Sequence, residues 1–294
     1  MNTLGRWEKR LLLTPTVLLL LFFSIFPLVF TLALMFGRVS FTGGAMTINF
    51  AGLDNWRRLL RDQRFWNAVL VTLKIVGIAV LAEYCIGLLL ALLLWQRPWG
   101  CGFFRVLYVI PMLLTPIAVG YTWRMILDVG RGPITGLLKQ LGLSPIGWLT
   151  ESSVALYSIV LIDVWQWTPF MFLLLYAGLE AIPKDYLEAA EVDGASGWKK
   201  FFYVVLPLLA PPSLAALLLR TVECFKIVDI IYITTGGGPG QATESLTLFG
   251  YNVGFRTFDL AYGATIAFTL FFMVLMAAMF FTMLTRNLRS IRLE

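Results

Sequence analysis

Histidine is absent from the 294 residues, and this absence excludes several kinds of chemistry. Without an imidazole, the chain has no Ser-His-Asp or Cys-His catalytic group and no histidine-dependent metal site. Cysteine is nearly as scarce, and Cys85, Cys101 and Cys224 are too scattered for a disulfide framework or a metal-ligand spacing. Charged residues make up only 14% of the chain, whereas hydrophobic residues make up 59%. A soluble domain of this composition would expose large apolar patches, so the composition indicates a membrane protein.

Long apolar stretches organise the chain, and each is long enough to cross the hydrocarbon core of a bilayer, which takes about 20 helical residues. They predict an all-α integral membrane protein with six transmembrane helices, near residues 11–36, 68–95, 106–127, 154–176, 208–233 and 261–284. The first stretch is too long for a cleaved signal sequence and lacks a small-residue cleavage site, so we interpret it as a retained span. Because no repeat or separate soluble segment is visible, residues 1–294 are expected to form a single transmembrane domain.

The distribution of Lys and Arg predicts that both termini are cytoplasmic. With this orientation, the inner segments carry eleven of the 23 basic residues and the outer segments carry eight. The inner residues are Arg6, Lys9, Arg10, Arg97, Arg105, Lys184, Lys199, Lys200, Arg286, Arg289 and Arg292. Half of the outer ones fall in residues 53–66, where Trp, Leu and Phe recur between arginines, as in a helix that lies along the membrane surface. The net charge of +6 is therefore attributed to membrane topology rather than to nucleic-acid binding.

A charged segment between the fourth and fifth stretches, residues 182–207, has the pattern of two short helices joined by a tight turn. Residues Tyr186 to Val192 form the first predicted helix. Asp193-Gly194 ends it, because glycine readily adopts the left-handed conformation found at helix ends. The second helix begins at Ser196, and Pro207 then opens the fifth span. We therefore predict a helix-turn-helix elbow that membrane helices hold at both ends, and residues 182–207 are called the elbow below.

The elbow resembles the EAA loop of ABC-importer permeases. That loop has Glu-Ala-Ala, two further residues, Asp-Gly-Ala, an aromatic residue and then Leu-Pro. The corresponding residues here are Glu188-Ala189-Ala190, Asp193-Gly194-Ala195, Phe201 and Leu206-Pro207. Three other segments are similar to the maltose-type, carbohydrate-importing branch, namely Gly52 to Trp56, Trp165 to Phe170 and Thr235 to Gly240. The resemblance extends over almost the whole chain.

The resemblance implies a type I ABC-importer permease bundle in the prokaryotic plasma (inner) membrane, which takes up a sugar, polyol or glycoside. It implies that a coupling helix, seated in a cleft of a cytoplasmic ATPase subunit, is formed by Glu188, Ala189, Ala190, Asp193, Gly194 and Ala195. The implied partners are a second related permease, two ATPase subunits, an extracytoplasmic solute-binding protein and membrane lipid. ATP and Mg belong to the ATPase partners, so this chain needs no cofactor. It has no Gly-Lys dipeptide and hence no phosphate-binding loop, so we do not expect an enzyme.

Charged side chains inside the apolar stretches need partners or a wet cavity, because each costs about 2.5–3.5 kcal/mol at mid-bilayer. Glu83, Asp163, Arg220 and Glu223 lie deep in their stretches, and the three-residue spacing allows an intrahelical pair between Arg220 and Glu223. A carboxylate, an amide and an indole on one helix face suit the hydroxyls and C–H faces of a sugar. The candidate pathway residues are Asp163, Gln166, Trp167, Arg220 and Glu223. Packing and charge pairing within the bundle remain an alternative for them.

Two other function classes are alternatives to an ABC importer. An ion-gradient-driven secondary transporter would account for the buried acids, but it leaves the elbow without a purpose and no inverted repeat is visible. A membrane-embedded enzyme has little support without histidine or clustered acids. Within the carbohydrate class, disaccharide, sugar alcohol, glycerol-phosphate-like and sulfosugar substrates all remain open.

Overall fold

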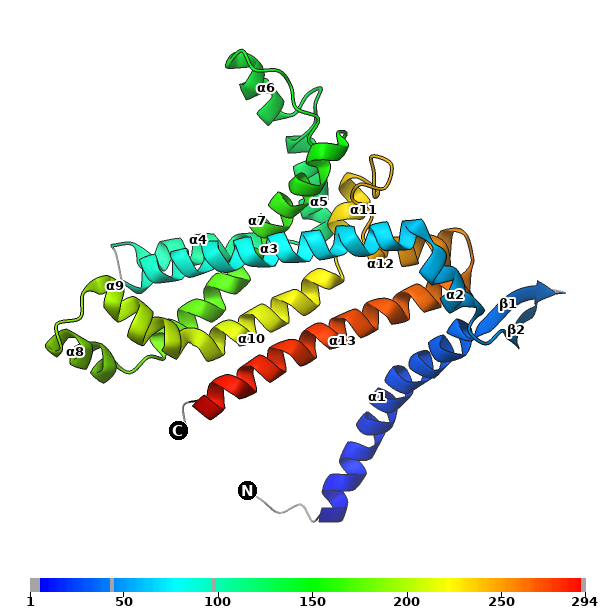
Figure 1. The fold of residues 1–294 in the computed structure, drawn as a ribbon, viewed down its shortest axis with the longest axis horizontal. Coiled ribbons are helices and arrows are strands. Elements are labelled where there is room, and N and C mark those ends of the chain that lie inside the picture. Colours follow the sequence, from blue (N-terminus) through cyan, green and yellow to red (C-terminus); the bar gives the residue numbers. More distant parts are fainter. Residues whose placement is uncertain (1–5, 43–44, 97–98, 292–294) are drawn as a thin grey trace. The chain divides into compact units, whose positions relative to one another are not determined.

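A computed structural model describes residues 6–42, 45–96 and 99–291 (Figure 1). The predicted cytoplasmic residues Arg97 and Arg292 lie outside the described residues. The same holds for the side chains of Arg6, Lys9, Arg10, Arg286 and Arg289. The chain divides into two compact units, residues 1–62 with 250–269 and residues 63–249 with 270–294. The expected single transmembrane domain stays a prediction.

The first unit begins with helix α1 (Arg6–Met35), which contains most of the first apolar stretch. An antiparallel hairpin of β1 (Gly37–Thr42) and β2 (Ala45–Phe50) follows, and then helix α2 (Asp54–Arg61). The π-helix η2 (Asn252–Arg256) and the start of α13 (Leu260–Ile291) complete the unit. Its small apolar core consists of Leu34, Met35, Ala264 and Phe268.

The hairpin is absent from the predicted elements, although the sequence carries a signal for it. Thr42 pairs with Ala45, and the two residues between them are Gly43-Gly44, a dipeptide typical of two-residue hairpin turns. The predicted surface helix at 53–66 is confirmed as a helix only for Asp54–Arg61. At Asp62 the backbone is extended, with ψ at 109°, and the rest of that segment begins α3. Its placement on the membrane surface stays a prediction.

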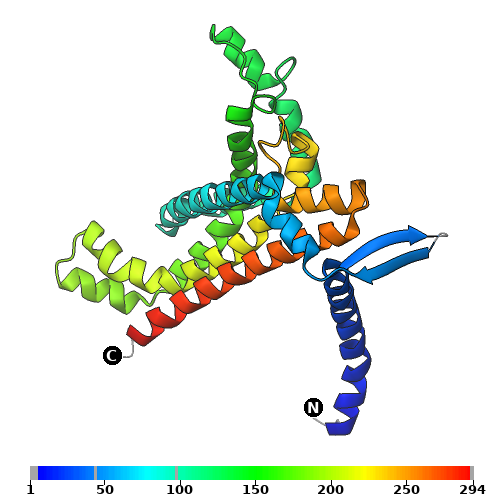
Figure 2. The same cartoon turned by 45° about the vertical axis from the view of Figure 1, so that its right-hand side comes forward.

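The second unit is a bundle of long helices with shorter helices at both ends (Figures 1 and 2). In chain order it contains α3 (Gln63–Trp95), α4 (Cys101–Leu113), α5 (Pro116–Ile126), α6 (Pro133–Gln140), α7 (Ser152–Glu180), α8 (Lys184–Val192), α9 (Gly197–Lys200), η1 (Phe201–Val205), α10 (Leu206–Phe225), α11 (Asp229–Thr234), the start of α12 (Leu246–Tyr251) and α13 from residue 270 onward. The central helix is α7, which packs against α3, α4 and α10.

Small residues allow the helices around α7 to approach closely. A Cβ atom on Gly178 of α7 would lie 2.8 Å from Pro212 Cγ of α10. On α3, a Cβ on Gly87 would lie 3.0 Å from the backbone nitrogen of Phe172. Glycine at both positions therefore brings the backbones together, as small residues do between membrane helices.

Four predicted spans coincide with unbroken helices, namely α1, α3, α7 and α13. The third is broken into α4 and α5, which are bent by 96°, because Pro116 lacks an N–H and forces extended backbone on Thr115 (ψ 140°). The fifth is also interrupted, since α10 ends at Phe225 and α11 begins at Asp229. By length and composition, the described residues hold five helical segments able to cross a membrane, or six if the bent pair is one span.

Candidate functional site

The turn in the elbow has the geometry of a Schellman helix end. The N–H of Ala195 donates to the carbonyl of Ala190 at 2.9 Å, and the N–H of Gly194 donates to the carbonyl of Glu191 at 3.0 Å. Gly194 has a φ of +71°, which confirms the predicted left-handed glycine. A Cβ at this position would meet no atom within 4 Å, so the backbone conformation alone requires glycine here.

The second half of the elbow differs from the prediction. Helix α9 begins after Ser196 as expected, but it continues through η1 into α10 without a break. Pro207 lies in the first turn of α10 and does not start a separate helix. Because Pro207 has no N–H for the preceding turn, the chain widens there into a π-helix, and Leu206 N–H bonds to the carbonyl of Phe201. The elbow and α10 are therefore one helical path.

The outer surface of the elbow carries both charge and aromatic rings. Of the six EAA-loop residues, Ala190 is buried and Ala195 is half-buried, whereas the exposed ones are Glu188, Ala189, Asp193 and Gly194. The ring of Trp198, 75% exposed, stacks on Phe202 with centroids 6.0 Å apart. Lys200 Nζ lies 2.5 Å from Glu191 Oε1 and ties α9 to α8. Exposed aromatic residues beside fixed charges are typical of a protein–protein contact surface.

A buried charge cluster joins three helices in the middle of the second unit. Arg220 of α10 donates to Glu83 of α3 through Nε at 2.6 Å and through Nη2 at 2.9 Å. The same Nη2 also donates to Asp163 of α7. Each of the three residues is at most 2% exposed. One guanidinium thus holds two carboxylates, and we call Glu83, Asp163 and Arg220 the buried triad.

The predicted intrahelical pair between Arg220 and Glu223 is wrong. The guanidinium of Arg220 turns to the carboxylates of two neighbouring helices, where burial makes an unpaired charge most costly. Glu223 instead pairs at 2.7 Å with Lys226, which directly follows the end of the same helix, and both side chains are about half exposed.

Four of the five candidate pathway residues line one polar cavity of about 240 Å³. These are Asp163, Trp167, Arg220 and Glu223, and the break between α10 and α11 supplies the opposite wall through residues 226–230. The Trp167 ring lies over the Arg220 guanidinium, with Cζ 5.3 Å from the ring centroid. Two members of the buried triad, Asp163 and Arg220, therefore line a cavity that also offers an indole face, the Glu223 carboxylate and interrupted helical backbone.

Gln166, the fifth candidate, does not line this cavity. Its Nε2 donates to the carbonyl of Leu114 at 3.0 Å, where α4 and α5 separate. That carbonyl lost its helical partner at the break, and a neighbouring helix now satisfies it, as broken membrane helices require. Gln166 Oε1 is buried and has no hydrogen-bond partner among the residues that the structure describes. We therefore assign Gln166 to the support of the α4–α5 bend.

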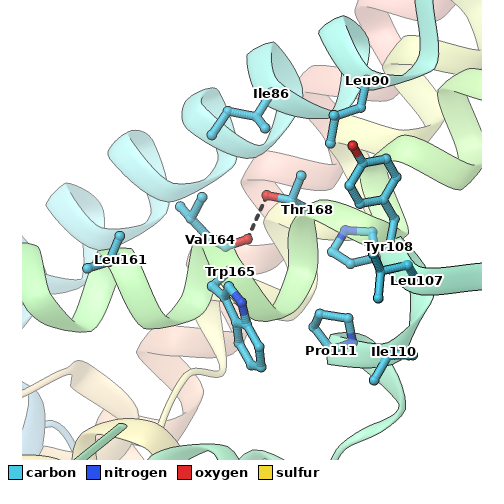
Figure 3. Close-up of a pocket in the computed structure, with 11 residues that line it drawn as sticks. Ile86, Leu90, Leu107, Tyr108, Ile110, Pro111, Leu161, Val164, Trp165 and Thr168 are labelled. Carbon is cyan, nitrogen blue, oxygen red and sulfur yellow. Dashed lines mark hydrogen bonds between the residues drawn. The ribbon is translucent and has the colours of Figure 1, made fainter. Parts of the chain in front are cut away.

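The neighbouring tryptophan on α7, Trp165, faces a different cavity (Figure 3). This cavity measures about 580 Å³ and lies between α3, α4 and α7. Its lining is almost wholly apolar, with Ile86, Leu107 and Pro111 among its residues, and Thr168 keeps its hydroxyl on the Val164 carbonyl at 2.6 Å. Helix α7 therefore presents one indole to a polar cavity and another to an apolar one.

Sequence reasoning missed one member of the buried triad and one part of the polar cavity. Glu83 was recognised as deep but not as a member of the site, because only the fold brings α3 to α10. The interruption at residues 226–228 contains no proline or glycine and left no local signal. Among the described residues, no group of three His, Cys, Asp or Glu side chains could hold a metal ion.

Comparison with known proteins adds sequence and fold relationships. Residues 83–290 match the family described as binding-protein-dependent transport system inner membrane component. The chain is 39% identical over 266 residues to the trehalose/maltose transport system permease protein MalF of Thermococcus litoralis, which covers 90% of this chain and 89% of that protein. It is 35% identical over 277 residues to the trehalose transport system permease protein SugA of Mycobacterium tuberculosis, covering 93% and 88% respectively. Its fold is similar to a chain of a bacterial alginate ABC transporter solved with an alginate pentasaccharide-bound periplasmic protein. The TM-score is 0.83 at 18% identity, over 96% of this chain and 94% of that one.

Proposed function

Because the chain belongs to the family of inner membrane components of binding-protein-dependent transport systems, we propose that it imports a carbohydrate or sugar-like solute as one permease subunit of an ABC importer. The chain is a multi-pass, non-catalytic transport subunit of the inner membrane. In the proposal, ATP and Mg are bound by separate ATPase subunits, and ATP hydrolysis there drives import.

The observation that carries this proposal is the geometry of the elbow. A Schellman turn fixes its angle, an ion pair ties its two helices together, and its second helix continues into α10. Such a rigid, exposed element suits the transfer of motion from a soluble partner to the bundle. We assign contact with the ATPase to the EAA-loop residues, Glu188, Ala189, Ala190, Asp193, Gly194 and Ala195.

The remaining parts of the assembly follow from this assignment. One elbow supplies one lever, and a two-fold or pseudo-two-fold transporter needs two. The proposed complex therefore contains a second related permease, two ATPase subunits and an extracytoplasmic solute-binding protein. The proposed topology has six spans, with both termini and the elbow on the cytoplasmic side.

The lining of the polar cavity suits a sugar-like solute. Trp167 offers a flat apolar face for the C–H surface of a pyranose ring, and carboxylate oxygens beside it accept hydroxyl hydrogen bonds. The names of MalF and SugA, which refer to trehalose and maltose, point to the same class.

Reconstitution tests the proposed function. The chain, its partner permease, the ATPase and the solute-binding protein are placed in vesicles, and uptake of labelled trehalose and maltose is measured with ATP or with a proton or sodium gradient. We expect uptake only with ATP and with all partners present. Uptake by this chain alone in response to an ion gradient would establish a secondary transporter instead.

Trp167→Ala tests the cavity as part of the solute pathway. Loss of an aromatic contact worth roughly 1–3 kcal/mol should weaken uptake about 5- to 150-fold while ATPase stimulation persists. The matched control is Trp165→Ala, which removes the same side chain from the apolar cavity and should leave uptake affinity unchanged. If the Trp167 variant imports normally, the solute contacts lie on the partner permease, and if it fails to assemble, Trp167 is a packing residue.

A further inference from the structure

A cluster of arginines surrounds α2 in the first unit. Arg38 from β1 joins Arg57, Arg58 and Arg61 from α2 around a cavity of about 640 Å³, whose other lining residues are Asp54 and Asp62. Four guanidinium groups thus face two carboxylates, and we call the four the α2 arginine cluster. We propose that this cluster binds the phosphate of anionic membrane lipids.

The ion pairs in this region leave guanidinium groups available. Asp54 lies 3.6 Å from Arg38 and 3.4 Å from Arg57, so one carboxylate serves two arginines through long contacts. The side chains of these two arginines are 76% and 73% exposed. Arg61 has no hydrogen-bond or ion-pair partner within the part of the chain that the structure describes. A guanidinium with free donors binds a phosphate through two parallel hydrogen bonds.

Arg58 has a different task within the cluster. It donates to Asp259 at 2.6 Å, and its guanidinium lies 4.0 Å above the ring of Tyr262. The hydroxyl of Tyr262 donates in turn to Asp62 at 2.6 Å. These contacts fix α2 to the first turn of α13, so the exposed arginines project from a rigid support.

The surroundings of α2 place the cluster at the height of the lipid headgroups. Asn55 donates to the carbonyls of Met35 and Gly37, directly after the apolar helix α1. Asp259, the partner of Arg58, immediately precedes the apolar helix α13, and α2 itself is followed after Asp62 by α3. Since the cluster lies where apolar helices end, it lies at the boundary between hydrocarbon and water.

Exposed apolar side chains on the same element favour a lipid over a soluble anion. Leu53 is 55% exposed and Leu60 62% exposed, while Phe50, just before α2, is 87% exposed. A short helix that exposes arginines beside large apolar residues can lie in the membrane interface, with its apolar side chains toward the acyl chains and its guanidinium groups toward the headgroups. Acyl chains satisfy these residues, whereas a free phosphate ion leaves them in water.

The test uses the full-length chain in detergent and measures lipid retention by native mass spectrometry. Phosphatidylglycerol is the anionic probe and phosphatidylcholine, whose choline neutralises the phosphate, is the matched zwitterionic probe. We expect retention of phosphatidylglycerol to be roughly tenfold or more above that of phosphatidylcholine. The variant Arg57→Gln/Arg61→Gln should remove this preference.

Matched controls distinguish the cluster from general positive charge. Arg131→Gln/Lys139→Gln removes two exposed cations near α6 and should keep the preference. A thermal melt verifies that each variant is folded, and Arg38→Gln/Arg61→Gln repeats the test with a different pair. Equal retention of both lipids, or a preference that survives in both cluster variants, would overturn the proposal.

Two further outcomes would assign the cluster to another ligand and also overturn the proposal. Inorganic phosphate that displaces phosphatidylglycerol at equal affinity would indicate a site for a soluble anion. If the cluster variants keep the lipid preference but lose binding of the solute-binding protein, the arginines form a protein-docking surface.

Discussion

Replacing Arg220 with methionine is expected to lower the free energy of unfolding by about 3–5 kcal/mol. The substitution keeps a long side chain but removes the only cation that Glu83 and Asp163 contact in the buried triad. Two carboxylates would then face each other in an environment that solvates neither of them. Denaturant unfolding in detergent micelles measures the change.

The control for this prediction is Lys226→Met, which breaks an exposed ion pair on the same helix. Because both partners are about half exposed, that variant should lie within about 1 kcal/mol of the parent chain. A triple variant, Arg220→Met with Glu83→Gln and Asp163→Asn, removes all three charges and should recover most of the lost stability. If it is as unstable as Arg220→Met alone, the loss comes from packing and not from uncompensated charge.

Replacing Gly194 with valine is expected to abolish import and stimulated ATP hydrolysis in the reconstituted transporter while the chain remains inserted. A β-branched residue at a φ of +71° costs about 1–3 kcal/mol, which disfavours the observed turn by roughly 5- to 150-fold. The two hydrogen bonds that close the Schellman turn would be lost with it, so the exposed face of α8 would change its angle relative to α9.

Two control variants distinguish the effect of a changed elbow shape from the general effect of backbone strain. Gly142→Val places the same residue at the same φ of +71°, next to α6, and should leave import and ATP hydrolysis intact. Gly194→Asn retains the left-handed conformation, which asparagine tolerates, and should keep most of the activity. Normal import by Gly194→Val would contradict the role assigned to the elbow.

The local parts of this molecule could be predicted from sequence, because they depend on neighbouring residues. The left-handed Gly194 and the helix start after Ser196 follow from glycine and serine preferences at helix ends, and the structure has both. Pro116 can be recognised from sequence as an interruption of its span, but the size of the bend, 96°, cannot. Apolar runs in the sequence locate helices well, but they do not distinguish one straight helix from two shorter helices that meet at nearly a right angle.

The charge cluster could not be assembled from sequence for a different reason. Spacing on one helix suggested Arg220 with Glu223, whereas the partners lie 137 and 57 residues away in sequence on α3 and α7. Pairing between helices depends on which faces the fold brings together, and a pattern on one helix holds no such information. The same limit hid the role of Gln166, whose partner is a backbone carbonyl exposed by a bend in another helix.

The helical path from α9 through η1 to α10 is continuous and joins the elbow to the wall of the polar cavity. This continuous helix carries Trp198 near one end and Arg220 near the other. At the helical rise per residue, the two are separated by about 30 Å. In the proposed importer, an ATPase bound at Trp198 would therefore act on the wall of the polar cavity, and a solute that displaces Arg220 would act on the elbow. Because such linkage is reciprocal, the proposed ATPase contact and the bound solute would change each other's binding affinity by the same factor. In the proposed importer, the same continuous helix therefore carries the effect of the solute to the ATPase and the effect of the ATPase to the solute.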